Sequence, residues 1–224
     1  MSLFALIGTK LNMISSKFFE STFLPAKFNG PKRSTKIMIV MHGLGDHKAS
    51  YKDFALEVNV TCLDYLLINA PTPYYFGFSW YDIPPGEPRD GIRNSIDKLE
   101  LLVNELNQKG YSDEDIILCG FSQGGCISLH SFLSWKRKFA GVVCLSPRIY
   151  LDKMEVQVKD IHSTTPIFMA HGHFDQAIDF NGVKSQMTRL KDEGLNISFH
   201  EYEIAHEIDI HEIRDLASWV NELL

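Results

Sequence analysis

From Lys36 onward the chain alternates short apolar runs with longer amphipathic segments. The apolar runs are continuous, a pattern that suits parallel strands covered on both faces. We expect strands at residues 36–41, 64–69, 115–119, 141–145, 165–169 and 196–200. Strands separated by helices imply right-handed crossovers between parallel neighbours. The pattern therefore predicts an α/β fold with a mostly parallel central sheet and helices on both faces.

Between these runs, apolar residues recur at spacings of three and four, which is typical of helices with one buried face. The spacing predicts helices around residues 92–106, 126–133, 183–190 and 213–220. Residues 1–35 do not follow the alternation, and within them residues 18–23 are a candidate edge strand. We expect residues 36–224 to form a single domain, with the N-terminal segment as part of it.

The composition is that of a soluble globular protein, with 45% hydrophobic and 22% charged residues among 224. A formal net charge of −6 gives no electrostatic support for nucleic acid or an anionic membrane as a partner. The basic cluster Lys136–Lys138 is predicted to complement a helix C-terminus. No apolar run approaches the roughly 20 residues that span a bilayer, so membrane insertion is not expected. Four cysteines without a close pair, and no signal-peptide pattern, favour a cytoplasmic protein with reduced thiols.

The sharpest motif is Gly120-Phe-Ser-Gln-Gly-Gly125, which joins a predicted strand directly to a predicted helix. A nucleophile elbow requires this strand–turn–helix context, with glycines where side chains would clash. The helix N-terminus would also place free N–H groups beside a developing oxyanion. The motif predicts Ser122 as a nucleophile; the competing interpretation is a glycine-rich turn that closes a βα unit.

A serine nucleophile needs a base, and the base needs an acid that orients it. In a fold with an elbow the order is serine, then acid, then histidine, each after a later strand. Asp175 and His206 follow the strands predicted at 165–169 and 196–202. The competitors are Asp179, which lies at the start of the next helix, together with His200 and His211.

Two further features are expected near Ser122. The oxyanion hole needs two converging backbone N–H groups, for which we predict Gln123 and Leu44, the latter in the glycine-rich loop His42-Gly-Leu-Gly-Asp46. The long segment 71–89 is rich in proline and aromatic residues, and such a segment either rims an apolar pocket or caps the sheet edge.

Two sequence patterns partly match known metal-binding motifs. His171-x-His-x-Asp175 is the start of a binuclear motif, but Gln176 stands where a further histidine is needed. His206-Glu-x-x-x-His211 is one residue too long to place both histidines on one helix face. We therefore predict no metal.

The motifs resemble those of the carboxylesterase/phospholipase/acyl-protein thioesterase family of α/β-hydrolases. The resemblance covers residues 36–224 and rests on MHGLGD (41–46), SWYD (79–82), GFSQGG (120–125), HGHFD (171–175) and AHEI around His206. It implies the α/β-hydrolase fold, a Ser122–Asp175–His206 triad, no cofactor, and Trp80 near the mouth of the active site, with Phe78 and Tyr81 beside it in the substrate pocket. The chain departs from the family at Leu145-Ser-Pro-Arg148 and at Gln176, which affects the expected shape of the acyl pocket.

The resemblance implies a serine carboxylesterase for short- to medium-chain acyl esters, working through an acyl-enzyme. An acyl-protein thioesterase or a lysophospholipase with the same triad is the alternative. Two other classes remain open: a non-catalytic ligand binder with this fold, and a metal hydrolase that uses His171, His173 and Asp175. The oligomeric state is not predicted.

Overall fold

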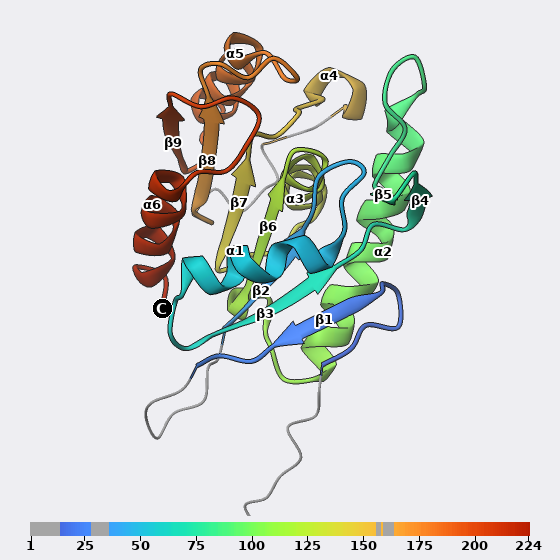
Figure 1. Ribbon diagram of the computed structural model, residues 1–224, viewed down its shortest axis with the longest axis vertical. Helices are drawn as coiled ribbons and strands as arrows, with labels where there is room; N and C mark the ends of the chain where they lie inside the picture. Colours follow the sequence, from blue (N-terminus) through green and yellow to red (C-terminus); the bar gives the residue numbers. More distant parts are fainter. Residues whose placement is uncertain (1–13, 28–35, 156–157, 159–163) are drawn as a thin grey trace, which may run out of the picture.

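In the computed structural model, residues 14–27, 36–155, 158 and 164–224 are described. Their strands form one seven-stranded sheet and a small two-stranded sheet (Figure 1). The large sheet contains β1 (Ser21–Leu24), β2 (Lys36–Met41), β3 (Leu63–Ile68), β6 (Ile116–Phe121), β7 (Gly141–Leu145), β8 (Ile167–Gly172) and β9 (Ile197–Tyr202); the small one contains β4 (Thr72–Tyr74) and β5 (Gly77–Ser79).

The strand order in the large sheet is β1-β3-β2-β6-β7-β8-β9. Every neighbouring pair is parallel except β1 with β3, in which Ser21 lies opposite Ile68. The chain runs from β2 outward to β3, then returns to the other side of β2 with β6. This reversal of strand order makes the carboxyl ends of β2 and β6 the point at which such sheets bind ligands.

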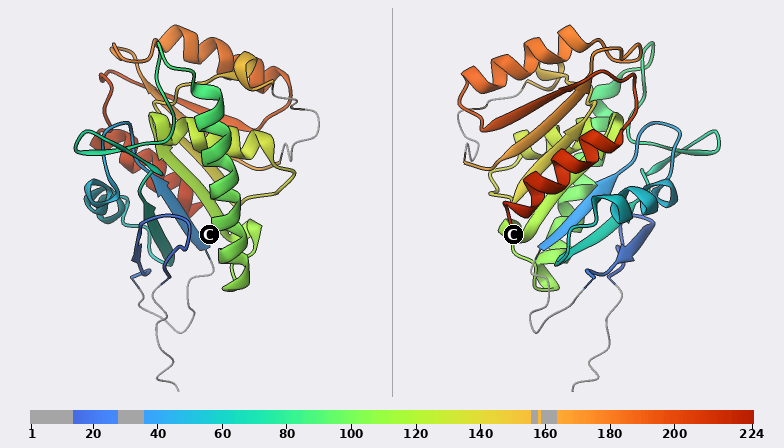
Figure 2. Two further views of the ribbon diagram at one scale, coloured as in Figure 1. Left: turned by 90° about the vertical axis from the view of Figure 1, so that its right-hand side faces the viewer. Right: turned by 60° about the vertical axis from the view of Figure 1, so that its left-hand side comes forward.

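Helices cover both faces of the sheet (Figure 2). One face packs against α2 (Pro88–Gln108), α3 (Gln123–Ser134), α4 (Leu151–Met154) and α5 (Phe180–Asp192), and the other against α1 (Tyr51–Val58) and α6 (Ile210–Asn221). Two short 3-10 helices, η1 (Lys48–Ser50) and η2 (Asp113–Asp115), lie in the connections after β2 and before β6. The strand β2 serves both layers: Ile37, Ile39 and Met41 face the first, whereas Met38 and Val40 face the second. The predicted α/β-hydrolase architecture, a mostly parallel sheet between helices, is confirmed.

Some elements differ from the sequence-based expectation. The candidate edge strand is observed as β1, shifted to Ser21–Leu24; residues 1–13 and 28–35 of the N-terminal segment lie outside the described residues. Helix α1 and the β4–β5 hairpin were not predicted. The hairpin lies within the proline- and aromatic-rich segment, where Pro73 pairs with Phe78.

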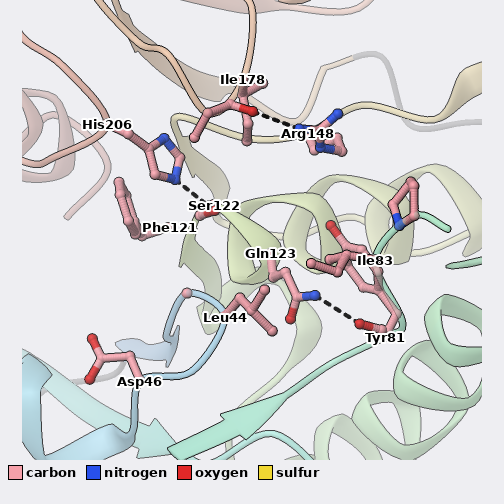
Figure 3. A pocket seen from close by; sticks show the side chains of 13 residues that line it. Leu44, Asp46, Tyr81, Ile83, Phe121, Ser122, Gln123, Arg148, Ile178 and His206 are labelled. Carbon is pink, nitrogen blue, oxygen red and sulfur yellow. Dashed lines mark hydrogen bonds between the residues drawn. The ribbon is translucent and has the colours of Figure 1, made fainter. Parts of the chain in front are cut away.

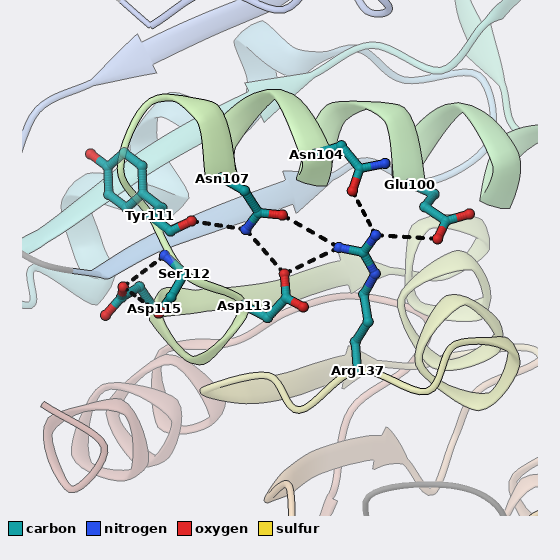
Figure 4. A network of polar contacts seen from close by, with 8 residues as sticks. All are labelled: Glu100, Asn104, Asn107, Tyr111, Ser112, Asp113, Asp115 and Arg137. Atoms are coloured by element: carbon teal, nitrogen blue, oxygen red, sulfur yellow. Dashed lines mark hydrogen bonds and ion pairs between the residues drawn. The ribbon is translucent and has the colours of Figure 1, made fainter.

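The central residue of the basic cluster 136–138 makes specific contacts that the sequence did not predict. Arg137 binds side chains, and Figure 4 shows it between α2 and the loop that ends at η2. Its Nη2 donates to Asn104 Oδ1 at 2.6 Å and lies 3.3 Å from Glu100 Oε1, and its Nη1 lies 3.2 Å from Asp113 Oδ1. Arg137 thus connects the end of α3 to α2 and to the segment that leads into β6.

None of the helices in the described part of the chain is long and apolar enough to cross a membrane.

Candidate active site

Ser122 stands at the turn between β6 and α3 with φ 54° and ψ −113°, in the left-handed half of backbone space. A non-glycine residue there is strained and persists only where its surroundings hold it. Here the N–H of Ser122 donates to Leu145 O at 2.8 Å, and its carbonyl accepts from the N–H of Cys126 at 3.0 Å. The turn exposes the serine hydroxyl at the carboxyl edge of the sheet, as a nucleophile elbow requires.

The glycines of the elbow are needed for close packing. A β-carbon at Gly120 would overlap the backbone of Gly124, and one at Gly124 would overlap the carbonyl oxygen of Met41 at the end of β2. The first turn of α3 can therefore sit directly against the ends of β6 and β2 only because both positions lack side chains.

The structure brings Ser122, His206 and Asp175 together although 84 and 31 residues separate the successive pairs (Figure 3 shows the serine and the histidine). His206 Nε2 lies 2.8 Å from Ser122 Oγ, and His206 Nδ1 lies 2.7 Å from Asp175 Oδ2. Because the carboxylate can only accept, Nδ1 carries the proton and Nε2 is free to accept the serine hydroxyl. His206 follows β9 and Asp175 follows β8, so each side chain comes from the carboxyl end of its strand.

Asp175 is held as an anion by its own loop. Its Oδ1 accepts hydrogen bonds from the N–H groups of Ala177 at 2.9 Å and Ile178 at 2.8 Å. Burial alone would oppose ionisation, but the hydrogen bond from Ile178 and the contact with His206 hold the pKa of Asp175 below its usual range. The acid therefore stays charged and can stabilise an imidazolium on His206.

His171, considered above as part of a metal motif, lies behind the acid. Its buried Nε2 is 2.9 Å from Ile178 O and 3.2 Å from Asp175 Oδ2. Burial lowers the pKa of His171, so the ring is neutral, and Nε2 donates because its neighbours are acceptors. His173 takes another direction and pairs with Glu201 Oε2 at 3.3 Å. The two histidines thus do not converge on one point with Asp175, and among the described residues no group of three potential ligands could hold a metal ion.

The alternatives to the predicted acid and base have other roles. Asp179 caps α5 by accepting from the N–H of Gly182 at 2.7 Å. His200 lies in β9, where its ring stacks on Phe168 at 4.3 Å, and His211 is in the first turn of α6. Neither histidine makes a hydrogen bond to Ser122 in the described structure.

A cavity of about 550 Å³ opens above Ser122 (Figure 3). Its walls come from five separate loops and from the elbow itself. The lining residues are Gly43, Leu44, Asp46, Tyr81, Ile83, Pro84, Phe121, Ser122, Gln123, Arg148, Ala177, Ile178 and His206. The two residues predicted as oxyanion donors therefore both face the space in front of the nucleophile. The N–H of Gln123 opens α3 and, as the first helical amide, has no acceptor within the helix.

The pocket differs from the prediction in its aromatic residues. Tyr81 lines the cavity, but Trp80 and Phe78 do not. Trp80 is 1% exposed, and its indole Nε1 donates to the carbonyl oxygen of His42. The side chain of Gln123 holds the backbone around Trp80. Its Oε1 accepts from the N–H of Trp80 at 3.0 Å, and its Nε2 donates to Tyr81 O at 2.8 Å. The tryptophan thus packs behind the pocket wall.

Sequence reasoning missed Ile83, Ile178 and Arg148 as pocket residues. Arg148 follows β7 just as Asp175 follows β8 and His206 follows β9, so the same rule about strand ends would have found it. The other two lie in loops whose course no periodicity indicates.

The fold, the elbow and the hydrogen-bonded serine, histidine and aspartate define a serine hydrolase of the α/β-hydrolase type. The family model described as phospholipase/carboxylesterase matches residues 27–224, and the chain belongs to that family.

Relatives and solved structures agree with this assignment. The chain is 31% identical to acyl-protein thioesterase 1 of Yarrowia lipolytica, over 91% of this chain and 97% of the relative. It is 33% identical to acyl-protein thioesterase 1 of Cryptococcus neoformans, over 88% of this chain and 96% of the relative. Among solved structures, the Bacillus cereus carboxylesterase superimposes with a TM-score of 0.79 at 14% identity, over 93% of this chain and 96% of that one, which shows a shared fold.

Proposed function

We propose that the chain hydrolyses acyl thioesters and esters through an acyl-enzyme on Ser122, with His206 as the base and Asp175 as the acid. The observation that carries the proposal is the pair of hydrogen bonds at 2.8 and 2.7 Å that links the three side chains in this order. A serine hydroxyl is a weak nucleophile until such a base can take its proton.

The geometry supports a two-step reaction. Ser122 Oγ attacks the acyl carbonyl while His206 Nε2 takes its proton, and the imidazolium then protonates the leaving thiol or alcohol. The backbone amides of Leu44 and Gln123 are the proposed donors to the oxyanion of each tetrahedral intermediate. In the second step, His206 takes a proton from water as the water attacks the acyl-enzyme. The acid is released when the bond to Ser122 Oγ breaks and His206 returns the proton to that oxygen.

We place a thioester ahead of an oxygen ester as the substrate. The sequence predicted a carboxylesterase first, with an acyl-protein thioesterase as the alternative. The two fungal relatives above are both named acyl-protein thioesterase 1, and this supports an acylated protein thiol as the natural leaving group. The same triad can cleave both substrates: the proton from His206 is needed for an alkoxide to leave, whereas a thiolate leaves with little help from it.

The test is a set of initial rates on thioesters and esters that carry the same acyl group, with Ser122→Ala alongside the parent protein. We expect the substitution to lower kcat by about 10⁴-fold or more. Ser134→Ala, an exposed serine at the end of α3, is the matched control and should leave both rates unchanged. Rates that survive Ser122→Ala would refute the proposed nucleophile. A folded protein that a serine-directed fluorophosphonate fails to label would favour the non-catalytic binder.

A further inference from the structure

Arg148 places a guanidinium in the cavity that contains Ser122. It lies in the loop just after β7, and Figure 3 shows its side chain beside Ile178 on the wall of the cavity. The other walls are mainly apolar, formed by Leu44, Ile83 and Pro84. A positive charge among such walls is poorly screened and attracts an anion more strongly than the same charge on an open surface.

The guanidinium is only partly engaged by the protein. Its Nη2 donates to the carbonyl oxygen of Ala177 at 2.7 Å. No carboxylate in the described ranges forms an ion pair with it, so most of its N–H groups remain available to a ligand. The other charged group on the wall, Asp46, accepts from Ser50 Oγ at 2.6 Å and from the N–H of His47 at 2.7 Å. Figure 3 shows Asp46 far across the cavity, on the other side of Leu44.

The ligand that matches a half-free guanidinium is a planar anion, because parallel N–H groups bind the two oxygens of a carboxylate together. The position of Arg148 indicates which part of a substrate carries this anion. The leaving group must face His206, which protonates it, and the acyl chain extends away from that histidine. Figure 3 shows His206 to the left of Ser122 and Arg148 to its right, at the far end of the same wall, and we therefore assign Arg148 to the acyl side.

We propose that Arg148 selects acyl groups that end in a carboxylate, so that the preferred substrates are thioesters or esters of dicarboxylic acids. This inference rests on the proposed function, since it needs Ser122 to be the acylated residue. Dicarboxylic acyl groups differ from a plain fatty acyl chain. A neutral chain would cover the guanidinium without providing a hydrogen-bond acceptor, which would weaken its binding.

A structural role for Arg148 is the competing explanation. The carbonyl that it binds belongs to Ala177, whose N–H holds Asp175 Oδ1. Loss of the arginine would then loosen the acid loop and slow every substrate equally. Charge recognition instead changes the ratio between an anionic and a neutral substrate, so that ratio is the decisive quantity.

The experiment compares kcat/KM for the p-nitrophenyl ester of adipic acid, with its distal carboxylate free, against the same ester with that carboxylate methylated. We expect the parent protein to prefer the free acid, and Arg148→Gln to lower that preference by roughly tenfold to a hundredfold, the effect of a hydrogen bond to a charged group. Arg148→Lys should restore part of the preference, and Arg93→Gln, an exposed arginine on α2, is the control. On the neutral ester, Arg93→Gln should match the parent protein, whereas Arg148→Gln should react somewhat faster, because the acyl chain no longer covers a guanidinium.

The possible outcomes distinguish failure of the proposed function from failure of the inference about Arg148. Activity that survives Ser122→Ala refutes the proposed function. Activity that needs Ser122 but shows the same preference with and without Arg148 overturns only this inference, as does an equal loss on both esters.

A second substrate pair moves the charge to the leaving group: hexanoyl 3-hydroxybenzoate and its methyl ester. A preference that depends on Arg148 in this pair would also overturn the assignment to the acyl side. If turnover is too slow to measure, a labelling experiment can test whether Arg148 recognises a carboxylate. It compares how well adipamic acid and adipamide protect Ser122 from a fluorophosphonate. Equal protection by the two compounds would refute the inference.

Discussion

The indole Nε1 of Trp80 donates to the backbone carbonyl oxygen of His42 at 2.9 Å. This bond joins the segment after β5 to the loop that contains Leu44, and the His42 side chain extends the connection by accepting from the N–H of Ala70 at 3.0 Å. All three groups are buried. The position of a proposed oxyanion donor is thus set by a tryptophan that does not touch the cavity.

Replacing Trp80 with phenylalanine should therefore impair catalysis. The variant keeps an aromatic ring but leaves the buried carbonyl of His42 without its donor, at a cost of about 1–3 kcal/mol. We expect kcat/KM to fall by about tenfold as the oxyanion loop loosens, while fluorophosphonate labelling of Ser122 persists. Phe76→Ala, at a fully exposed ring in the same segment, is the control. Unchanged kinetics in Trp80→Phe would show that the oxyanion loop does not depend on this bond.

His171 is expected to act on the reaction through the acid. Its replacement by leucine keeps the bulk but removes the donor to Ile178 O and the contact with Asp175. We expect kcat to fall about tenfold with little change in KM, because substrate binding does not involve this side chain. His173→Ala, two residues away and paired with Glu201, should have little effect. A change confined to KM would place His171 in substrate binding instead.

The elbow should not tolerate a methyl group at Gly124. An alanine there would overlap the carbonyl oxygen of Met41, and the first turn of α3 would have to move away from β2. We expect Gly124→Ala to unfold the protein at lower urea concentration and to lose most activity even where it remains folded. Gly182→Ala, in an exposed turn of α5, tests the general effect of alanine and should be nearly neutral. Full activity in Gly124→Ala would disprove the steric argument.

Glu212, buried in the first turn of α6, should make stability depend on pH. Burial, helped by the nearby charge of Asp209, raises the pKa of its carboxyl to about 8. Between the unfolded-state pKa, roughly 4.3, and this value, the folded protein holds a proton that the unfolded chain has released. The free energy of unfolding therefore falls as pH rises through this window, by at most about 1.4 kcal/mol per pH unit.

Glu212→Gln removes this titration. Its stability advantage over the parent protein should grow from pH 5 to pH 8, roughly the window set by the two pKa values, and then level off. Urea unfolding at several pH values measures the difference directly, with Glu222→Gln, exposed at the end of the same helix, as the control. A difference that does not vary with pH would show that Glu212 is charged in the folded protein.

The central sheet and the three residues Ser122, Asp175 and His206 were accessible from the sequence because they obey strict local rules. Continuous apolar runs indicate buried parallel strands, and the elbow must lie between a strand and a helix. Helix α1 was missed because it has only eight residues, with four buried positions, and directly follows the short 3-10 helix η1. The position of Trp80 was missed because its burial depends on contacts with Gln123 and His42, which lie 43 and 38 residues away in the sequence.

The reactive serine is oriented by main-chain packing among glycines, whereas the cavity in front of it is built from side chains on separate loops. Under the proposed function, catalysis and substrate preference therefore depend on different residues. We expect substitutions at Ile83, Arg148 or Ile178 to change the preferred substrate and to leave the reaction mechanism intact. A combinatorial library restricted to these positions should accordingly yield many active hydrolases with diverse preferences, whereas one that includes Gly120 or Gly124 should yield few.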